Sequence, residues 1–278
     1  MSAVVDFWRR YRRNHVAVAA AVLLAGVVGT AAIGPLLYPR DPFEMVGRPF
    51  SRPFGEFPLG TDVSGRDILA GIVHGARVSL LIGLVSSVCA TVVGVTLGAV
   101  AGYHGGLLDD VLMRSTEFFL TIPSFVLAVV LVAIFSPSVF SVTAAIAVVS
   151  WPSVARLARA EFLAQKGREY VQACRALGMP TWAIMCFQIL PNALPPVIVV
   201  ASLMVATAIL TEAGLSFLGL GDPNVVSWGY MIGVARTVLR VAWWMAAIPG
   251  VTIILTVLAI NMVGEGLNEA LNPRLDRR

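Results

Sequence analysis

The chain has 278 residues, of which 58% are hydrophobic and 13% charged, and its mean hydropathy is +0.83. Soluble domains carry about 25% charged residues, so this composition disfavours a water-soluble fold. The formal net charge of +4 is interpreted as a membrane-topology signal, and nothing in the sequence calls for a nucleic-acid partner. The charged residues are confined to short stretches, so the uncharged runs between them can be compared with the bilayer thickness.

The first two uncharged runs each predict one membrane span. The run between Arg13 and Arg40 is long enough for one helix of about 20 residues. The run 78–108 would form a helix of roughly 46 Å, which exceeds the hydrocarbon core of about 30 Å. We therefore expect a span followed by a turn near residues 102–106.

The later runs predict four more spans. The run 118–155 is too long for one crossing, and Ser136, Pro137 and Ser138 provide a break that divides it into two spans. The run 176–211 begins as a turn and is predicted to become a span only after Pro195 and Pro196. The uncharged run between Arg240 and Glu265 provides the last one. The sequence thus predicts an all-α integral membrane protein with about six transmembrane helices.

Basic residues orient this arrangement, because they are retained near the cytoplasmic ends of spans. An N-terminus inside places thirteen basic residues on the inner side: Arg9, Arg10, Arg12, Arg13, Arg114, Arg156, Arg159, Lys166, Arg168, Arg175, Arg274, Arg277 and Arg278. It places seven outside: Arg40, Arg48, Arg52, Arg66, Arg77, Arg236 and Arg240. Both termini are therefore predicted to be cytoplasmic. The first apolar run also resembles a secretory signal, but it exceeds the usual 7 to 15 residues of such signals, which favours an uncleaved anchor.

Several kinds of chemistry lack support. The three histidines have no metal-ligand spacing, and the three cysteines are interpreted as small packing residues, because Cys174 and Cys186 fall near the reducing inner side. The spans contain almost no ionisable side chains, which disfavours an ion-coupled carrier. The single lysine, Lys166, belongs to no phosphate-binding loop. If ATP drives the protein, another chain must bind the ATP.

One short string suggests an enzyme. Residues Gly219, Leu220, Gly221 and Asp222 match the G-x-G-D pattern of intramembrane aspartyl proteases, which need two carboxylates that share a proton. Asp109 and Asp110 are predicted at an inner end, whereas Asp222 is predicted in an outer loop. Carboxylates on opposite sides of a membrane form no dyad, so the glycines are interpreted as loop residues.

The longest predicted inner loop, about residues 156–188, contains a short amphipathic helix. One face is predicted to hold Tyr170, Ala173, Cys174 and Leu177, and the other Arg168, Gln172 and Arg175. Gly178 is placed where a left-handed C-cap is often needed, and Pro180 suits the first turn of a second helix. Amphipathicity alone leaves two roles open, which are lying on the lipid surface and docking a partner.

A resemblance favours the docking role. Residues 169–178, followed by Ile189, Leu190, Pro191 and Asn192, resemble the EAA loop of permease subunits of binding-protein-dependent ABC importers. Gln172, Cys174 and Gln188 depart from that pattern. Because Gln172 replaces its glutamate, Glu169 or Arg168 is the alternative polar contact. The resemblance implies the ATPase-coupling residues Arg168, Glu169, Tyr170, Gln172, Ala173, Cys174, Arg175, Leu177, Gly178, Leu190 and Pro191.

Further strings resemble the C-type permease of the dipeptide and oligopeptide branch. They cover residues 8–14, 58–62, 65–67, 102–106, 215–221 and 272–274. The resemblance implies a type I ABC importer permease fold in a bacterial cytoplasmic membrane. The expected organisation is a tail, first span and outer segment (1–75), a permease core (76–272) and a cytoplasmic tail (273–278).

The same resemblance implies the partners and the substrate class. The chain is expected to pair with a homologous permease, two ATP-binding subunits and an extracytoplasmic solute-binding protein. It should bind no cofactor itself, because ATP and Mg²⁺ belong to the ATPase chains. Peptides are the expected substrate, with nickel, glutathione or haem as alternatives. Residues 40–76 are expected to receive the binding protein, to cover the exit or to act as a passive linker. A non-transporting membrane anchor is the alternative from another class.

Overall fold

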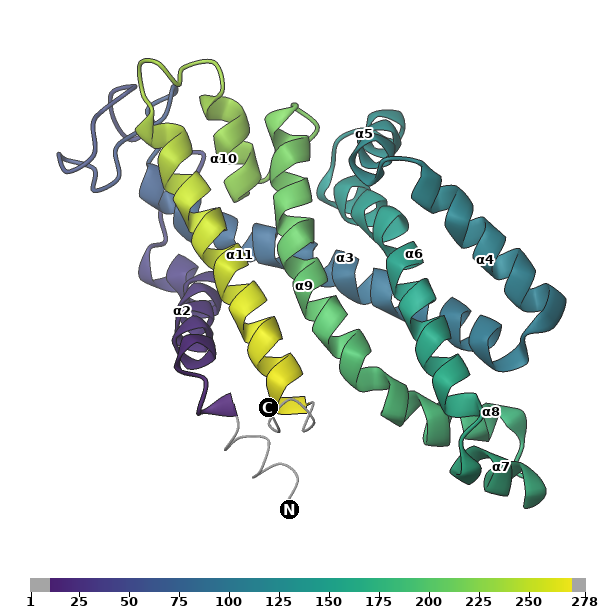
Figure 1. The fold of residues 1–278 in the computed structure, drawn as a ribbon. Coiled ribbons are helices and arrows are strands. Elements are labelled where there is room, and N and C mark those ends of the chain that lie inside the picture. The colour runs from purple at the N-terminus through teal and green to yellow at the C-terminus, as the bar shows by residue number, and fades with distance from the viewer. Residues whose placement is uncertain (1–10, 272–278) are drawn as a thin grey trace.

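A computed structural model describes residues 11–271 and shows a bundle of long helices (Figure 1). Four uninterrupted helices are long and apolar enough to cross a membrane: α2 (His15–Leu37), α3 (Ile68–His104), α6 (Val139–Lys166) and α11 (Trp244–Leu271). A fifth runs through Thr181–Phe217 and comprises α8 (Thr181–Ala183), the π-helical turn η1 (Ile184–Ile189) and α9 (Leu190–Phe217). Among the described residues the only β-structure consists of two isolated bridges.

The third predicted span, counted along the chain, is a bent pair of helices. Helices α4 (Gly106–Thr121) and α5 (Ser124–Phe135) are together long and apolar enough to cross a membrane but are bent by 87°. The break lies at Ile122 and Pro123, where proline cannot donate the helical hydrogen bond. The number of about six spans is confirmed, whereas the span expected between residues 118 and 136 is a pair of helices that already begins at Gly106. The predicted break at residues 136–138 is confirmed, and Ser138 caps α6 by accepting from the Ser141 amide.

The first two helices begin at polar caps. Asn14 Oδ1 accepts from the Ala17 amide at 2.9 Å at the start of α2, and Asp67 Oδ1 accepts from the Leu69 amide at 2.9 Å at the start of α3. Helix α3 therefore starts ten residues before the uncharged run, so Arg77 lies within a helix and not in an outer loop. Its 37 residues extend about 55 Å, which is longer than a perpendicular crossing requires.

A row of glycines allows α3 and α6 to approach closely. Gly94, Gly98 and Gly102 recur at intervals of four along α3 and face α6. A β-carbon at Gly94 would lie 2.6 Å from that of Val154, and one at Gly102 would lie 2.9 Å from that of Phe162. Small residues at this spacing let membrane helices pack backbone to backbone, so this contact sets the centre of the fold.

Helix α6 is longer than the sequence predicts. It continues through Arg156 and Arg159 to Lys166, and Arg159 is paired there with Asp109 of α4 by two hydrogen bonds of 2.5 and 2.7 Å. The inner connection is therefore much shorter than residues 156–188. The next span is already helical from Thr181, and Pro195 and Pro196 lie inside α9 instead of marking its start.

A buried carboxylate joins α9 to α10 (Trp228–Ala235). Glu212 is 2% exposed and accepts from the Ser216 and Ser227 hydroxyls at 2.8 and 2.7 Å. A β-carbon at Gly229 would lie 2.7 Å from a Glu212 oxygen, so glycine is required there. The sequence did not predict this carboxylate, because the uncharged run ends at Thr211.

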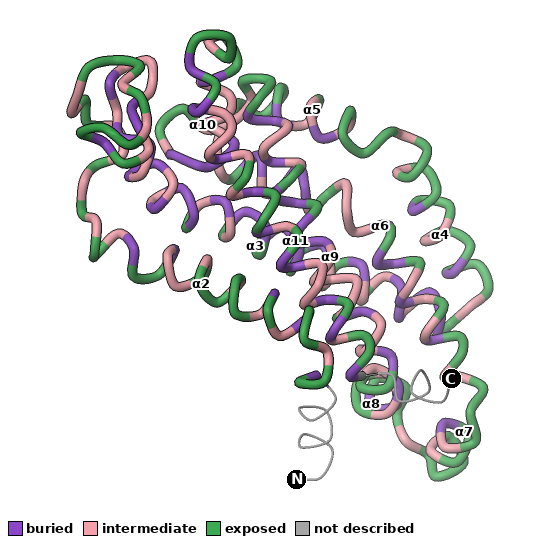
Figure 2. Tube along the Cα trace, turned by 60° about the vertical axis from the view of Figure 1, so that its left-hand side comes forward, coloured by how far each residue is buried: buried purple, intermediate pink, exposed green. Residues whose placement is uncertain are grey.

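Burial divides the bundle into a packed interior and an apolar exterior. Buried residues follow α3 and α9, whereas much of α2 and α4 is exposed (Figure 2). The exposed side chains on α2 include Val22 at 68% and Val28 at 50%. Such a surface suits lipid, and the whole arrangement places one short helix, α7 (Glu169–Ala176), at the end of the bundle where α2 begins and α11 ends (Figure 1).

Candidate coupling helix

Local sequence sets both ends of α7. Arg168 has extended backbone angles at the N-cap, and Glu169 lies in the first turn, where a negative charge complements the helix dipole. After the helix, Gly178 has φ +75°, which confirms the predicted left-handed position. The Met179 amide donates to the Cys174 carbonyl and the Gly178 amide to that of Arg175, which together form a Schellman turn.

The structure corrects the predicted faces of this helix. Val171, which belongs to neither predicted face, is fully buried, whereas Leu177 is 82% exposed. Val171 packs in a cluster with Tyr103, Phe162, Ile184, Ile189 and Ala193. Tyr170 and Cys174 lie at the edge of this cluster, so one half of the predicted apolar face is correct. Ala173 and Leu177, which were expected on the same face, are exposed, so the buried side of the helix is turned toward Val171.

Polar contacts fix the helix to the span that precedes it. The Tyr170 hydroxyl donates to Gln165 Oε1, and Gln172 Nε2 donates to the Gly167 carbonyl, each at 3.1 Å. The guanidinium of Arg175 lies 5.1 Å from the centre of the Tyr103 ring. Gln172 and Arg175 therefore already contact neighbouring parts of this chain.

The predicted coupling residues thus fall into two groups. Tyr170, Cys174 and Leu190 are partly buried; Arg168, Glu169, Gln172, Ala173, Arg175, Leu177, Gly178 and Pro191 are exposed. Pro191 lies in the first turn of α9, where its missing amide is tolerated. The structure brings both groups to the same end of the bundle, on α7 and at the start of the following span.

Two exposed aromatic side chains extend this surface. Trp182 is 63% exposed and Phe187 is 64% exposed, and their rings meet edge to face with centroids 5.8 Å apart. Together with Leu177 they present large apolar groups at the end of the bundle. The sequence signal that could have found them is the presence of large aromatics beside a predicted helix turn.

The opposite end of the bundle carries a folded connection between α2 and α3. Thr61 is fully buried, accepts from the Ser51 amide at 2.9 Å and donates to the Arg48 carbonyl at 2.6 Å. The Tyr38 hydroxyl donates to Asp67 at 2.5 Å, and burial, with this hydrogen bond, raises the pKa of Tyr38. These contacts disfavour the passive-linker interpretation of residues 40–76.

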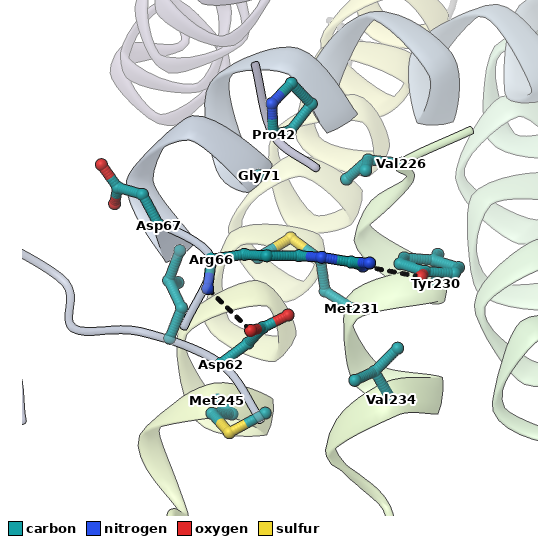
Figure 3. A pocket seen from close by; sticks show the side chains of 11 residues that line it. Pro42, Asp62, Arg66, Asp67, Gly71, Val226, Tyr230, Met231, Val234 and Met245 are labelled. Carbon is teal, nitrogen blue, oxygen red and sulfur yellow. Dashed lines mark hydrogen bonds between the residues drawn. The ribbon is translucent and has the colours of Figure 1, made fainter. Parts of the chain in front are cut away.

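A small cavity lies beneath this connection. Figure 3 shows that the Arg66 side chain extends across it, with its guanidinium donating to the Tyr230 hydroxyl at 3.2 Å. The Arg66 amide donates to Asp62 at 2.9 Å. The cavity volume of about 30 Å³ is enough for about one water molecule, so it is no peptide pocket.

The protease interpretation requires a second carboxylate close to Asp222, and the structure provides none at Asp109. Asp222 accepts from the Val139 amide at 3.1 Å and from the Asn224 amide at 2.9 Å, so it caps the start of α6. Asp109, at the start of α4, lies at the other end of the bundle (Figure 1). Within residues 11–271, no group of three or more His, Cys, Asp or Glu residues could hold a metal ion.

The fold and the short helix between two long spans define a class of protein. The chain resembles a chain of the solved structure described as inward-facing conformations of the MetNI methionine ABC transporter, with a TM-score of 0.61 and 20% identity. The match covers 73% of this chain and 96% of that chain. The fold is therefore that of a type I ABC importer permease, as expected.

Sequence comparison gives the family. Residues 94–277 match the model of the binding-protein-dependent transport system inner membrane component, and the chain belongs to this family. Residues 2–51 match the N-terminal transmembrane domain of oligopeptide transport permease C. The family and the apolar helices identify a multi-pass inner membrane protein, which confirms the predicted localisation.

Relatives cover nearly the whole chain. The di/tripeptide transport permease DppC of Pseudomonas aeruginosa is 40% identical over 99% of this chain and 93% of its own length. The dipeptide permease DppC of Haemophilus influenzae is 37% identical over 97% and 94%. The glutathione permease GsiD of Pectobacterium atrosepticum is 37% identical over 97% and 90%. The predicted resemblance to C-type peptide permeases is confirmed.

Proposed function

We propose that the chain is one permease subunit of an ATP-driven importer of di- or oligopeptides. The observation that carries this proposal is the 40% identity to a di/tripeptide permease over 99% of the chain. Glutathione is the second candidate substrate, because a glutathione permease is 37% identical over 97% of the chain. Glutathione is itself a tripeptide derivative, so both candidates belong to one chemical class.

The importer requires partners that supply energy and substrate. The sequence has no phosphate-binding loop around its only lysine, so ATP and Mg²⁺ bind to separate ATPase subunits. A homologous permease completes the translocation path, and a solute-binding protein delivers peptide to the outer end, where residues 40–76 receive it. The chain itself acts mechanically and catalyses no reaction.

Helix α7 is the element that couples the chain to its ATPase. Its outward side presents Glu169, Ala173 and Leu177, and Trp182 and Phe187 lie beside it. Val171 and the Schellman turn at Gly178 fix this side relative to α6 and α9. Movement of the ATPase would therefore be transmitted to two spans at once. Arg168 remains a candidate polar contact, because its side chain is exposed and makes no cap to α7.

The experiment compares two glycines in open space. No atom lies within 4 Å of a β-carbon at Gly178 or Gly167, but only Gly178 has a positive φ. Gly178→Val should distort the turn, since a left-handed β-branched residue costs about 1–2 kcal/mol. In proteoliposomes containing the complete importer, it should insert normally and hydrolyse ATP without taking up labelled dipeptide.

Gly167→Val is the matched control and should retain uptake, because Gly167 has φ −83°. Gly178→Asn should restore most uptake, since asparagine tolerates the left-handed conformation. Wild-type dipeptide uptake by Gly178→Val would contradict the coupling role. Uptake of labelled glutathione but not dipeptide by the wild-type importer would contradict di- or oligopeptides as the substrate in favour of glutathione and would leave the coupling role intact.

A further inference from the structure

An apolar groove lies between four helices on the surface of the bundle. Its volume is about 640 Å³, and α2, α3, α9 and α11 contribute its walls. Leu81, Leu84 and Val28 line it and are 48%, 57% and 50% exposed. Arg77 and Ser202 are the only polar side chains among the lining residues, so the groove is aliphatic except at these two positions.

Arg77 is held in the groove by a backbone carbonyl of α2 that lacks its helical hydrogen-bond donor. Pro35 has no amide hydrogen, so the Ala31 carbonyl, four residues earlier, loses its normal helical donor. The Arg77 Nε atom donates to this carbonyl at 3.3 Å, and a terminal guanidinium nitrogen lies 3.5 Å from the Ala32 carbonyl. The proline and the arginine therefore fix the position of the charge relative to the groove.

The charge of Arg77 has no opposite charge within the described part of the chain. The ion pairs between residues 11 and 271 are Arg40 with Asp67 and Arg159 with Asp109, and neither involves Arg77. Its side chain is also exposed. Since two backbone carbonyls occupy only part of the guanidinium donor set, Arg77 can bind an additional anion.

The groove extends from this charge toward the middle of the bundle. Ala31 lies six residues before the end of α2, which corresponds to about 9 Å along the helix. From Arg77 to Val85 the wall of α3 continues for about 12 Å, and α2 from Ala32 to Leu24 runs alongside it. A cation near one membrane surface above an aliphatic channel is complementary to a phosphate headgroup with its acyl chain.

We propose that this groove binds one anionic phospholipid, with its phosphate on Arg77 and an acyl chain along α3. The side chains that line its open part are leucine and valine, whereas close helix pairing in membranes uses small residues such as those of the α3–α6 contact. A flexible acyl chain fits branched aliphatic walls better than a rigid helix about 10 Å wide. The proposal is independent of the transported substrate.

The test measures retained lipid on the complete importer. The complex is reconstituted in nanodiscs of phosphatidylcholine with a minor share of phosphatidylglycerol, then released and examined by native mass spectrometry. The wild type should retain one phosphatidylglycerol, and Arg77→Gln should reduce retention about tenfold, as expected for loss of a charge-assisted contact. Arg77→Lys should retain an intermediate amount, because the charge remains without the fork of donors.

Matched variants separate the charge from the groove. Arg240→Gln removes another exposed cation and should leave retention unchanged. Leu84→Trp should fill the groove and abolish retention, whereas Val92→Trp, on an exposed part of α3 outside the groove, should not. If Arg77→Gln fails to fold, Leu84→Trp carries the test with the same readout.

Three results would overturn the proposal. Equal retention of phosphatidylcholine and phosphatidylglycerol by the wild type would remove the role of the charge. Unchanged retention in both Arg77→Gln and Leu84→Trp would place the lipid elsewhere. A disulfide between Leu84→Cys and a cysteine in a span of the partner permease, formed in native membranes, would show that a protein helix occupies the groove.

Discussion

Two apolar residues six positions apart, Val171 on α7 and Leu177 at its C-cap, have opposite environments. Val171 is fully buried against α3, α6 and η1, whereas Leu177 is 82% exposed beside the Schellman turn. The first side chain holds the helix in the fold. The Leu177 side chain contributes nothing to the interior of this chain, so any stabilisation it provides depends on a partner surface that covers it.

Alanine substitutions should therefore separate stability from assembly. Val171→Ala should lower stability by about 2 kcal/mol, because it leaves a cavity in a packed cluster. Leu177→Ala should leave the thermal midpoint of the purified chain unchanged and reduce the amount of ATPase subunit that copurifies with it. The opposite pattern, with a lower midpoint for Leu177→Ala alone, would show that the exposed face belongs to the fold.

At the scale of elements, the contact of α3 with α6 determines how the spans are arranged. Gly94, Gly98 and Gly102 recur every fourth residue, and no other residue type fits against the α6 backbone at these points. At Gly98 the β-carbon would collide with the Ala155 carbonyl, and a carbonyl cannot move without disturbing its helix.

Gly98→Leu should accordingly separate α3 from α6 and lower the thermal midpoint of the detergent-solubilised importer or prevent its recovery. Gly29→Leu is the control, because no atom lies within 4 Å of a β-carbon at Gly29, and it should behave as the wild type. Equal stability of the two variants, measured by fluorescence-detected size-exclusion chromatography over a temperature series, would contradict the close contact.

The elements differ in how well the sequence predicted them, and the difference has a physical cause. The break at residues 136–138 and the turn at Gly178 depend on local chemistry, which is readable from proline, serine and glycine alone. The predicted start of the fifth span was wrong because Pro195 and Pro196 are tolerated inside α9, where neighbouring helices stabilise the helix. The burial of Val171 depends on tertiary contacts with α3, α6 and η1, which no local pattern contains.

At the scale of the whole molecule, the bundle has two chemically different ends. Helix α7, the start of α2 and the end of α11 lie at one end, and residues 38–67 and α10 lie at the other (Figure 1). The excess of basic residues predicts that the end with α7 is cytoplasmic. That orientation also lets α7 face an ATPase and residues 40–76 face a solute-binding protein.

Cysteine labelling tests this orientation. In a variant without Cys89, Cys174 and Cys186, Gly167→Cys should react with an impermeant maleimide only in inside-out vesicles, because Gly167 is exposed at the α7 end. Phe54→Cys should react only in intact spheroplasts, since Phe54 is 95% exposed in the opposite segment. The reverse labelling pattern would invert the orientation and refute the proposed positions of both partners.

The carboxylate of Glu212 has a consequence for how the protein is made. A charged side chain in a membrane span costs up to about 3 kcal/mol during insertion. Ser216 belongs to the same helix and can pair with it as soon as that helix forms, whereas Ser227 follows in the next segment of the chain. During synthesis, Glu212 Oε1 therefore lacks one of its two hydroxyl donors until Ser227 is in place, so the fifth span and α10 should mature as one unit in the membrane.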